Sequence, residues 1–245
     1  MDIPDPGLRA ARARSFGPAA GVYEAARPGY PSDAVRDLLG SSPLDVLDLG
    51  AGTGKLTRVA VAEGHRVLAV DPSAEMLAEL ARVVPGVETR VGTAEALPVD
   101  DAAFDAVVAG QAYHWFDPAV ALPEIARVLR PGGTLGLLWN SRDEEVPWIA
   151  RFGELVGSED ASSTLIAPTL EPLFGPASVR WYDHLQEMTV ARLVDLGHSR
   201  SSLLVMSPTD RATRLAEIRA LGESVASGGS VSMHYRLQVW SAVRT

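Results

Sequence analysis

Five short apolar runs mark the first 140 residues, and between them apolar residues recur every three or four positions. A short apolar run bounded by turn residues is typical of a buried strand, whereas the three-to-four spacing is typical of one helix face. The runs cover residues 46–49, 67–70, 87–91, 104–109 and 134–139. This alternation predicts an α/β fold with a doubly wound, mostly parallel sheet. Its ligand should bind at the carboxyl ends of the strands.

The last hundred residues carry a different pattern. Two segments with strand-like alternation, residues 179–188 and 231–243, flank stretches with helical spacing. Helices are expected over residues 150–156, from a Thr189 cap onward, and over 208–225. We therefore expect two further strands and a group of helices after residue 140.

The first apolar run leads into a glycine-rich turn, Asp48-Leu49-Gly50-Ala51-Gly52-Thr53-Gly54. Glycine lets the backbone turn sharply and lets a ligand approach without a Cβ in the way. A dinucleotide fingerprint would need glycine at Lys55, and a phosphate-binding loop would need a hydroxyl at Leu56. Asp71 closes the second apolar run, where a carboxylate is placed to accept hydrogen bonds from both hydroxyls of a ribose.

Composition excludes several classes of protein. With 245 residues and 26.0 kDa, the chain is expected to form one domain. A net charge of −9 argues against a broad nucleic-acid surface, and the lack of cysteine excludes disulfides and thiolate metal sites. No clustered ligand set indicates a metal. No signal peptide or membrane-length apolar run is evident either, so we expect a soluble, cytoplasmic protein.

The glycine turn together with Asp71 resembles the first two motifs of the class I S-adenosylmethionine (SAM) methyltransferases. The resemblance implies SAM as the cofactor, with the turn and Arg27 on its methionine moiety and Asp71 on its ribose. Thr93 stands where the family usually has an acid facing the adenine amine, and Glu95 is the alternative. The candidate cofactor-binding residues are Tyr23, Arg27, Asp48, Gly50, Ala51, Gly52, Thr53, Asp71, Pro72, Met76, Thr93, Ala94, Glu95 and Gln111.

Two further stretches, Tyr23-x-x-x-Arg27-Pro28-Gly29-Tyr30-Pro31 and Gln111-Ala112-Tyr113-His114-Trp115-Phe116, look like the methyltransferase type 11 group. Within that group they are most similar to the trans-aconitate methyltransferase-like branch. The resemblance covers nearly the whole chain and implies a Rossmann-like sheet of seven strands, one of them antiparallel, under a helical lid. It divides the single domain 1–245 into N-terminal helices (1–40), a SAM-binding core (41–140), and lid helices with the last two strands (141–245).

His114 is the catalytic candidate, because it follows the fourth strand at the edge where the methyl group should lie. A neutral imidazole there could accept a proton or orient a substrate oxygen. The alternative is a histidine packed between Tyr113 and Trp115. The candidate substrate-binding residues are Tyr113, Trp115, Asn140 and Trp148.

The resulting prediction is methyl transfer from SAM to a small-molecule acceptor, without nucleic-acid or membrane partners. Two alternatives stay open: a SAM-binding biosynthetic enzyme that does not methylate, and an inactive binding module that has kept the fold. The sequence also leaves a homodimer open.

Overall fold

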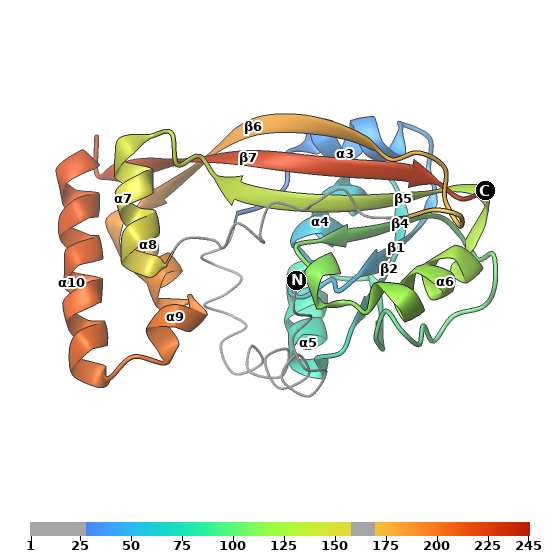
Figure 1. The fold of residues 1–245 in the computed structure, drawn as a ribbon, viewed down its shortest axis with the longest axis horizontal. Coiled ribbons are helices and arrows are strands. Elements are labelled where there is room, and N and C mark those ends of the chain that lie inside the picture. The colour runs from blue at the N-terminus through green and yellow to red at the C-terminus, as the bar shows by residue number, and fades with distance from the viewer. Residues whose placement is uncertain (1–27, 158–169) are drawn as a thin grey trace.

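The computed structural model describes residues 28–157 and 170–245, which form a seven-stranded sheet with helices on both faces (Figure 1). The strand order is β3-β2-β1-β4-β5-β7-β6, and only β7 runs antiparallel to its neighbours. This confirms the expected mostly parallel sheet. The strands are β1 Asp45–Leu49, β2 Arg66–Asp71, β3 Glu88–Val91, β4 Phe104–Gly110, β5 Leu129–Arg142, β6 Ser178–Thr189 and β7 Ser230–Val243.

The described helices divide into two groups. The first group packs on the sheet around β1 to β5 and consists of α3 Ser32–Leu39, α4 Lys55–Ala62, α5 Ala74–Val83, the 3-10 turn η2 Tyr113–Trp115 and α6 Pro118–Val128. The apolar residues of α3 and α4 pack on one face of the sheet and those of α6 on the other. The second group consists of α7 Pro147–Val156, α8 Val190–His198, α9 Ser201–Leu204 and α10 Pro208–Val225.

Strands β5, β7 and β6 extend past the carboxyl end of β4. The last β4 pair joins Gly110 to Leu138, whereas β5 continues to Arg142 and β6 and β7 remain paired as far as Thr189 and Ser230. We call the extension formed by residues 139–142, 182–189 and 230–238 the overhang. It projects from the sheet edge at which the parallel strands end.

The second helix group is mounted on the overhang, at one end of the molecule (Figure 1). Its buried residues form a hydrophobic core separate from that of the main sheet. The members of this second core are Ile149, Phe152, Leu155, Val156, Met188, Leu193, Leu196, Leu203, Ile218, Val231, Met233 and Tyr235. Helices thus lie where a lid was expected, but residues 158–169 of that region are outside the described residues.

One local prediction was wrong. The fifth strand begins at Leu129 instead of at residue 134, because Leu129 already pairs with Phe104 before a bulge carries the chain to Thr134. By contrast, the capping of α8 by Thr189 is confirmed, since its hydroxyl accepts a hydrogen bond from the Arg192 amide.

Over residues 28–157 and 170–245 we find no helix long and apolar enough to cross a membrane. In the same ranges no three His, Asp or Glu side chains are grouped so as to hold a metal ion.

Candidate functional site

The glycine turn joins β1 to α4, and its three glycines all have positive φ angles. A Cβ on Gly50 would lie 2.5 Å from the Ala112 Cβ, and one on Gly54 would lie 2.7 Å from the Leu80 Cγ. These two glycines are therefore required by packing as well as by backbone conformation. A Cβ on Gly52 would meet nothing within 4 Å, so Gly52 borders open space. The middle of the turn is the part that a ligand can approach.

Asp71 ends β2 beside this turn. Its Oδ2 accepts a hydrogen bond from the Gly52 amide at 2.9 Å, and its Oδ1 accepts one from the Ser73 amide at 2.8 Å. Burial raises the pKa of Asp71, while the two amide hydrogen bonds act in the opposite direction. Each carboxylate oxygen keeps a second acceptor position. The side chain is thus fixed in place and can still accept two hydrogen bonds.

Asp48 lies beneath the turn and is almost fully buried. Its Oδ2 accepts a hydrogen bond of 2.5 Å from the Thr57 hydroxyl on α4, whereas its Oδ1 has no hydrogen-bond partner. Burial, with a smaller contribution from the negative charge of Asp71, raises the pKa of Asp48 to about 7. A cation placed against the turn would favour the ionised form of this carboxyl.

The loop after β3 carries the adenine-side candidates. The Gly92 amide donates to the Asp71 carbonyl, which ties the loop to the end of β2. Thr93 is exposed and Ala94 is buried. Glu95, the alternative adenine partner, accepts a hydrogen bond from the Asp117 amide at 2.9 Å, so one of its oxygens is used within the protein.

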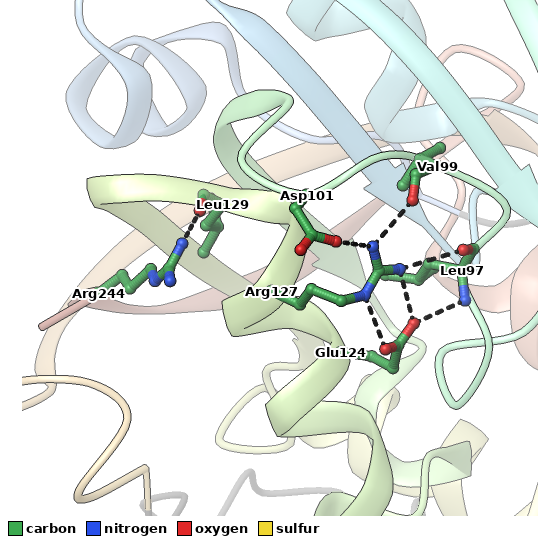
Figure 2. Close-up of polar contacts among 7 residues, drawn as sticks. All are labelled: Leu97, Val99, Asp101, Glu124, Arg127, Leu129 and Arg244. Atoms are coloured by element: carbon green, nitrogen blue, oxygen red, sulfur yellow. Dashed lines mark hydrogen bonds and ion pairs between the residues drawn. The ribbon is translucent and has the colours of Figure 1, made fainter.

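A network around Arg127 fixes the rest of this loop to α6 (Figure 2). The guanidinium donates twice to Glu124, once to Asp101, and once each to the carbonyls of Leu97 and Val99. All five of its N–H groups are therefore engaged. Glu124 in turn accepts from the Leu97 amide at 3.1 Å. This network was not predicted from the sequence, although the Glu124-x-x-Arg127 spacing is a local signal of the Glu124–Arg127 pair.

Gln111 follows β4 with a φ angle of +55°, which is uncommon for a residue with a side chain. Its amide donates to the Leu138 carbonyl and its Nε2 donates to the Asn140 carbonyl, both at 2.9 Å. This conformation turns the chain so that Ala112 packs on Gly50. The turn that carries His114 therefore lies directly against the glycine turn.

The His114 side chain is exposed, and its ring lies against the rings of Trp115 and Trp139, with both centroid distances 4.6 Å. Of the two neighbours expected for a packed ring, Trp115 is confirmed, and Trp139 of β5 is a further neighbour that was not expected. Tyr113 instead meets Phe116 edge-on at 5.8 Å, and burial raises the pKa of its phenol. His114 thus lies where η2 meets the start of the overhang.

The substrate-binding candidates separate in space. Tyr113 and Trp115 pack against the main core, whereas Trp148 packs against the second core on α7. Asn140 is buried and its amide is used within the protein: Nδ2 donates to the Gly29 carbonyl at 3.1 Å, and Oδ1 lies 2.7 Å from the His184 Nε2. Both polar atoms of the Asn140 side chain are thus engaged within the protein, and a contact of this residue with substrate stays a prediction.

The remaining cofactor-binding candidates lie just after β2, on α5 and before residue 28. Pro72 is exposed beside Asp71, and Met76 is buried on α5. Tyr23 and Arg27 lie outside the described residues. No role was predicted for Tyr30 from the sequence; its phenol packs against the Cα of Gly110 at the end of β4.

The chain is similar to known methyltransferases. A family model described as a methyltransferase domain matches residues 47–137. A curated Mycobacterium tuberculosis relative, the uncharacterized methyltransferase Rv3342, is 45% identical over 207 residues, which cover 84% of this chain and 85% of the relative. A trans-aconitate 2-methyltransferase from an Azoarcus species is 35% identical over 173 residues, or 62% of this chain and 61% of that protein.

Solved structures show the same fold. A methyltransferase from Anaeromyxobacter dehalogenans superposes with a TM-score of 0.68 at 23% identity, covering 89% of this chain and 97% of that one. The family match extends from within β1 into β5 and so contains both the glycine turn and Asp71. The chain therefore belongs to the methyltransferase family.

Proposed function

We propose that the protein transfers a methyl group from SAM to a small-molecule acceptor bound at the overhang, with helices α7 to α10 acting as a lid. The observation that supports this most strongly is the arrangement at the carboxyl edge of the sheet. The open position at Gly52, the fixed carboxylate of Asp71 and the turn carrying His114 lie together at the ends of β1, β2 and β4.

The side chains at this edge of the sheet offer a partner for each polar part of SAM. The two unused acceptor positions of Asp71 suit the ribose hydroxyls. The open face at Gly52 admits the methionine part, and the unpartnered Oδ1 of Asp48 offers a negative charge for its ammonium group. We assign the adenine to the side of Met76, Thr93 and Ala94, and the methionine carboxylate to Arg27.

SAM supplies a methyl group that is already activated on a sulfonium, so the protein mainly positions the nucleophile in line and excludes water. His114 is our candidate for orienting the acceptor and for taking its proton on an imidazole nitrogen. Because His114 is exposed, the proton can pass on to solvent. Contact with Trp115 and Trp139 fixes the plane of the imidazole.

The face of the overhang that carries Trp139 presents polar groups that suit a methyl acceptor. Trp139 and Gln238 are cross-strand neighbours on β5 and β7, and both are more than nine-tenths buried. The indole nitrogen of Trp139 and the Oε1 of Gln238 have no hydrogen-bond partner. A hydrogen-bond donor on Trp139 and a hydrogen-bond acceptor on Gln238 are thus available near His114. A bound polar molecule that pairs with both would compensate for the cost of burying them.

Release of S-adenosylhomocysteine (SAH) with a panel of small acceptors tests this function. The Azoarcus relative makes trans-aconitate the first compound to try. We expect acceptor-dependent release that His114→Gln slows about 100-fold, in the range of a lost acid-base group. The matched control is His198→Gln, which changes an exposed histidine at the end of α8. Consumption of SAM without a methylated product would contradict the proposal.

A further inference from the structure

Asn140 joins three segments that are distant in the sequence. Its Nδ2 donates to the carbonyl of Gly29, in the segment before α3, and its own carbonyl accepts from Gln111 Nε2 at the end of β4. Its Oδ1 contacts the Nε2 of His184 on β6 at 2.7 Å. Asn140 itself is only 2% exposed, and the three hydrogen bonds are partly buried.

The hydrogen bond between Asn140 and His184 can have only one donor. Because the Nδ2 of Asn140 donates to a carbonyl, its Oδ1 must be the acceptor, and the Nε2 of His184 must carry the proton. Burial lowers the pKa of His184, which favours the neutral ring. The ring also stacks on Tyr235, with 5.5 Å between centroids and 21° between planes. His184 therefore holds the amide of Asn140 in the orientation that binds Gly29.

The segment held in this way lies over the end of β4. Tyr30 follows Gly29 and rests its phenol on Gly110, the last residue of that strand. The strand order β2-β1-β4 puts this segment on the far side of the glycine turn from Asp71. With the ribose at Asp71, the segment faces the methionine end of the cofactor. Arg27, which the sequence assigns to the methionine carboxylate, precedes Gly29 by two residues.

We propose that Asn140 and His184 are positioning residues that hold Gly29 and Tyr30 against the methionine end of the SAM site. Neither side chain needs to touch the cofactor. The proposal rests on the proposed function, since it takes the cofactor to be SAM with its ribose at Asp71.

Two ligands that differ only at the methionine end provide the test. SAH carries the amino-acid part, whereas 5′-methylthioadenosine keeps the adenine and ribose but lacks it. Their dissociation constants are measured by isothermal titration calorimetry for the wild type, Asn140→Ala and His184→Phe. We expect both variants to raise the dissociation constant of SAH about tenfold, as for loss of a buried hydrogen bond. The dissociation constant of methylthioadenosine should stay within about twofold of the wild-type value.

Three further variants separate positioning from general damage. His184→Gln keeps an N–H donor and should restore most of the SAH affinity. Gln186→Met, at the next position on the same face of β6, should leave both affinities unchanged. Asp71→Asn should weaken both ligands, because both contain the ribose. Thermal unfolding of each variant shows whether it is folded.

The outcomes are distinct. A selective loss of SAH affinity that His184→Gln restores supports the positioning role. Equal weakening of both ligands, or unchanged affinity for both, overturns it and leaves the proposed function standing. If the folded wild type binds neither ligand, the proposed function fails, and the positioning role fails with it.

Discussion

Two buried aspartates at neighbouring strand ends serve different purposes. Asp71 is held by two backbone amides, one of which belongs to Gly52 in the open part of the glycine turn, and each of its oxygens keeps a further acceptor position. Asp48 is beneath that turn and is bonded to Thr57, which attaches the turn to α4. Asp71 thus keeps acceptor positions that a ligand can use, whereas Asp48 is a buried carboxyl whose charge is coupled to that of Asp71.

The raised pKa of Asp48 makes the stability of the free protein depend on pH. The folded protein binds this proton more tightly than the unfolded chain, so the contribution of Asp48 to stability is full below the ordinary carboxyl pKa. It is lost as the pH rises to about 7. The free energy of unfolding should fall by up to about 1.4 kcal/mol per pH unit over that window.

Asp48→Asn removes this titration but keeps an oxygen that can accept from Thr57. In urea unfolding we expect the variant to be more stable than the wild type at pH 8, with the gain shrinking at pH 5 and below. The surface variant Asp100→Asn is the control and should keep the wild-type profile. An Asp48→Asn profile parallel to that of the wild type would show that Asp48 is not the titrating group.

At the scale of elements, some features were predicted from the sequence because their causes are local. The glycine turn, the strand ends and the Thr189 cap depend on residues a few positions apart. The contact of His114 with Trp139, the hydrogen bonds of Arg127 to Leu97, Val99 and Asp101, and the Asn140–His184 pair join residues 25 or more positions apart. No local pattern encodes such contacts, and they decide how the loops of the site are held.

Arg127 and Arg82 provide a matched comparison, because each lies three residues after a glutamate on a helix. Arg127 also reaches two loop carbonyls and Asp101, whereas the Arg82 side chain is 69% exposed and pairs with Glu79. We expect Arg127→Ala to destabilise the protein by about 1–3 kcal/mol and Arg82→Ala by less than about 0.5 kcal/mol.

Hydrogen exchange locates the effect of Arg127→Ala. Faster exchange should appear in residues 93–103, where the guanidinium holds the chain. An equal loss of unfolding free energy in Arg127→Ala and Arg82→Ala, or unchanged hydrogen exchange in this loop, would mean that the network does not hold the adenine-side loop.

At the scale of the whole molecule, the described residues form four hydrophobic clusters on one sheet. The main core lies under the proposed SAM site, and the second core attaches helices α7, α8 and α10 to the overhang (Figure 1). The sequence predicted both late strands, but the overhang depends on the pairing register of β4 with β5, which periodicity does not fix. Because the cores are separate, a change in the second core should affect the lid more than cofactor binding.

Ile218→Ala tests this separation. Ile218 is fully buried on α10 and packs closely on Gly197 of α8. The cavity left in the second core should lower the free energy of unfolding by about 2–5 kcal/mol. We expect SAM affinity within about twofold of the wild type but SAH release slowed about tenfold, because the lid closes less well. Val205→Ala, at an exposed position, is the control. A matching loss of SAM affinity would show that the two cores act as one.

The central claim is that SAM binds at the carboxyl edge of the sheet with its ribose on Asp71. Isothermal titration of the purified protein with SAM, and separately with NADH, tests it most directly when repeated on Asp71→Ala. The account predicts low-micromolar SAM binding, no NADH binding, and loss of tight SAM binding in a folded Asp71→Ala variant. Unchanged SAM affinity in that variant would contradict the placement of the ribose, and absence of SAM binding to the wild type would contradict the site itself.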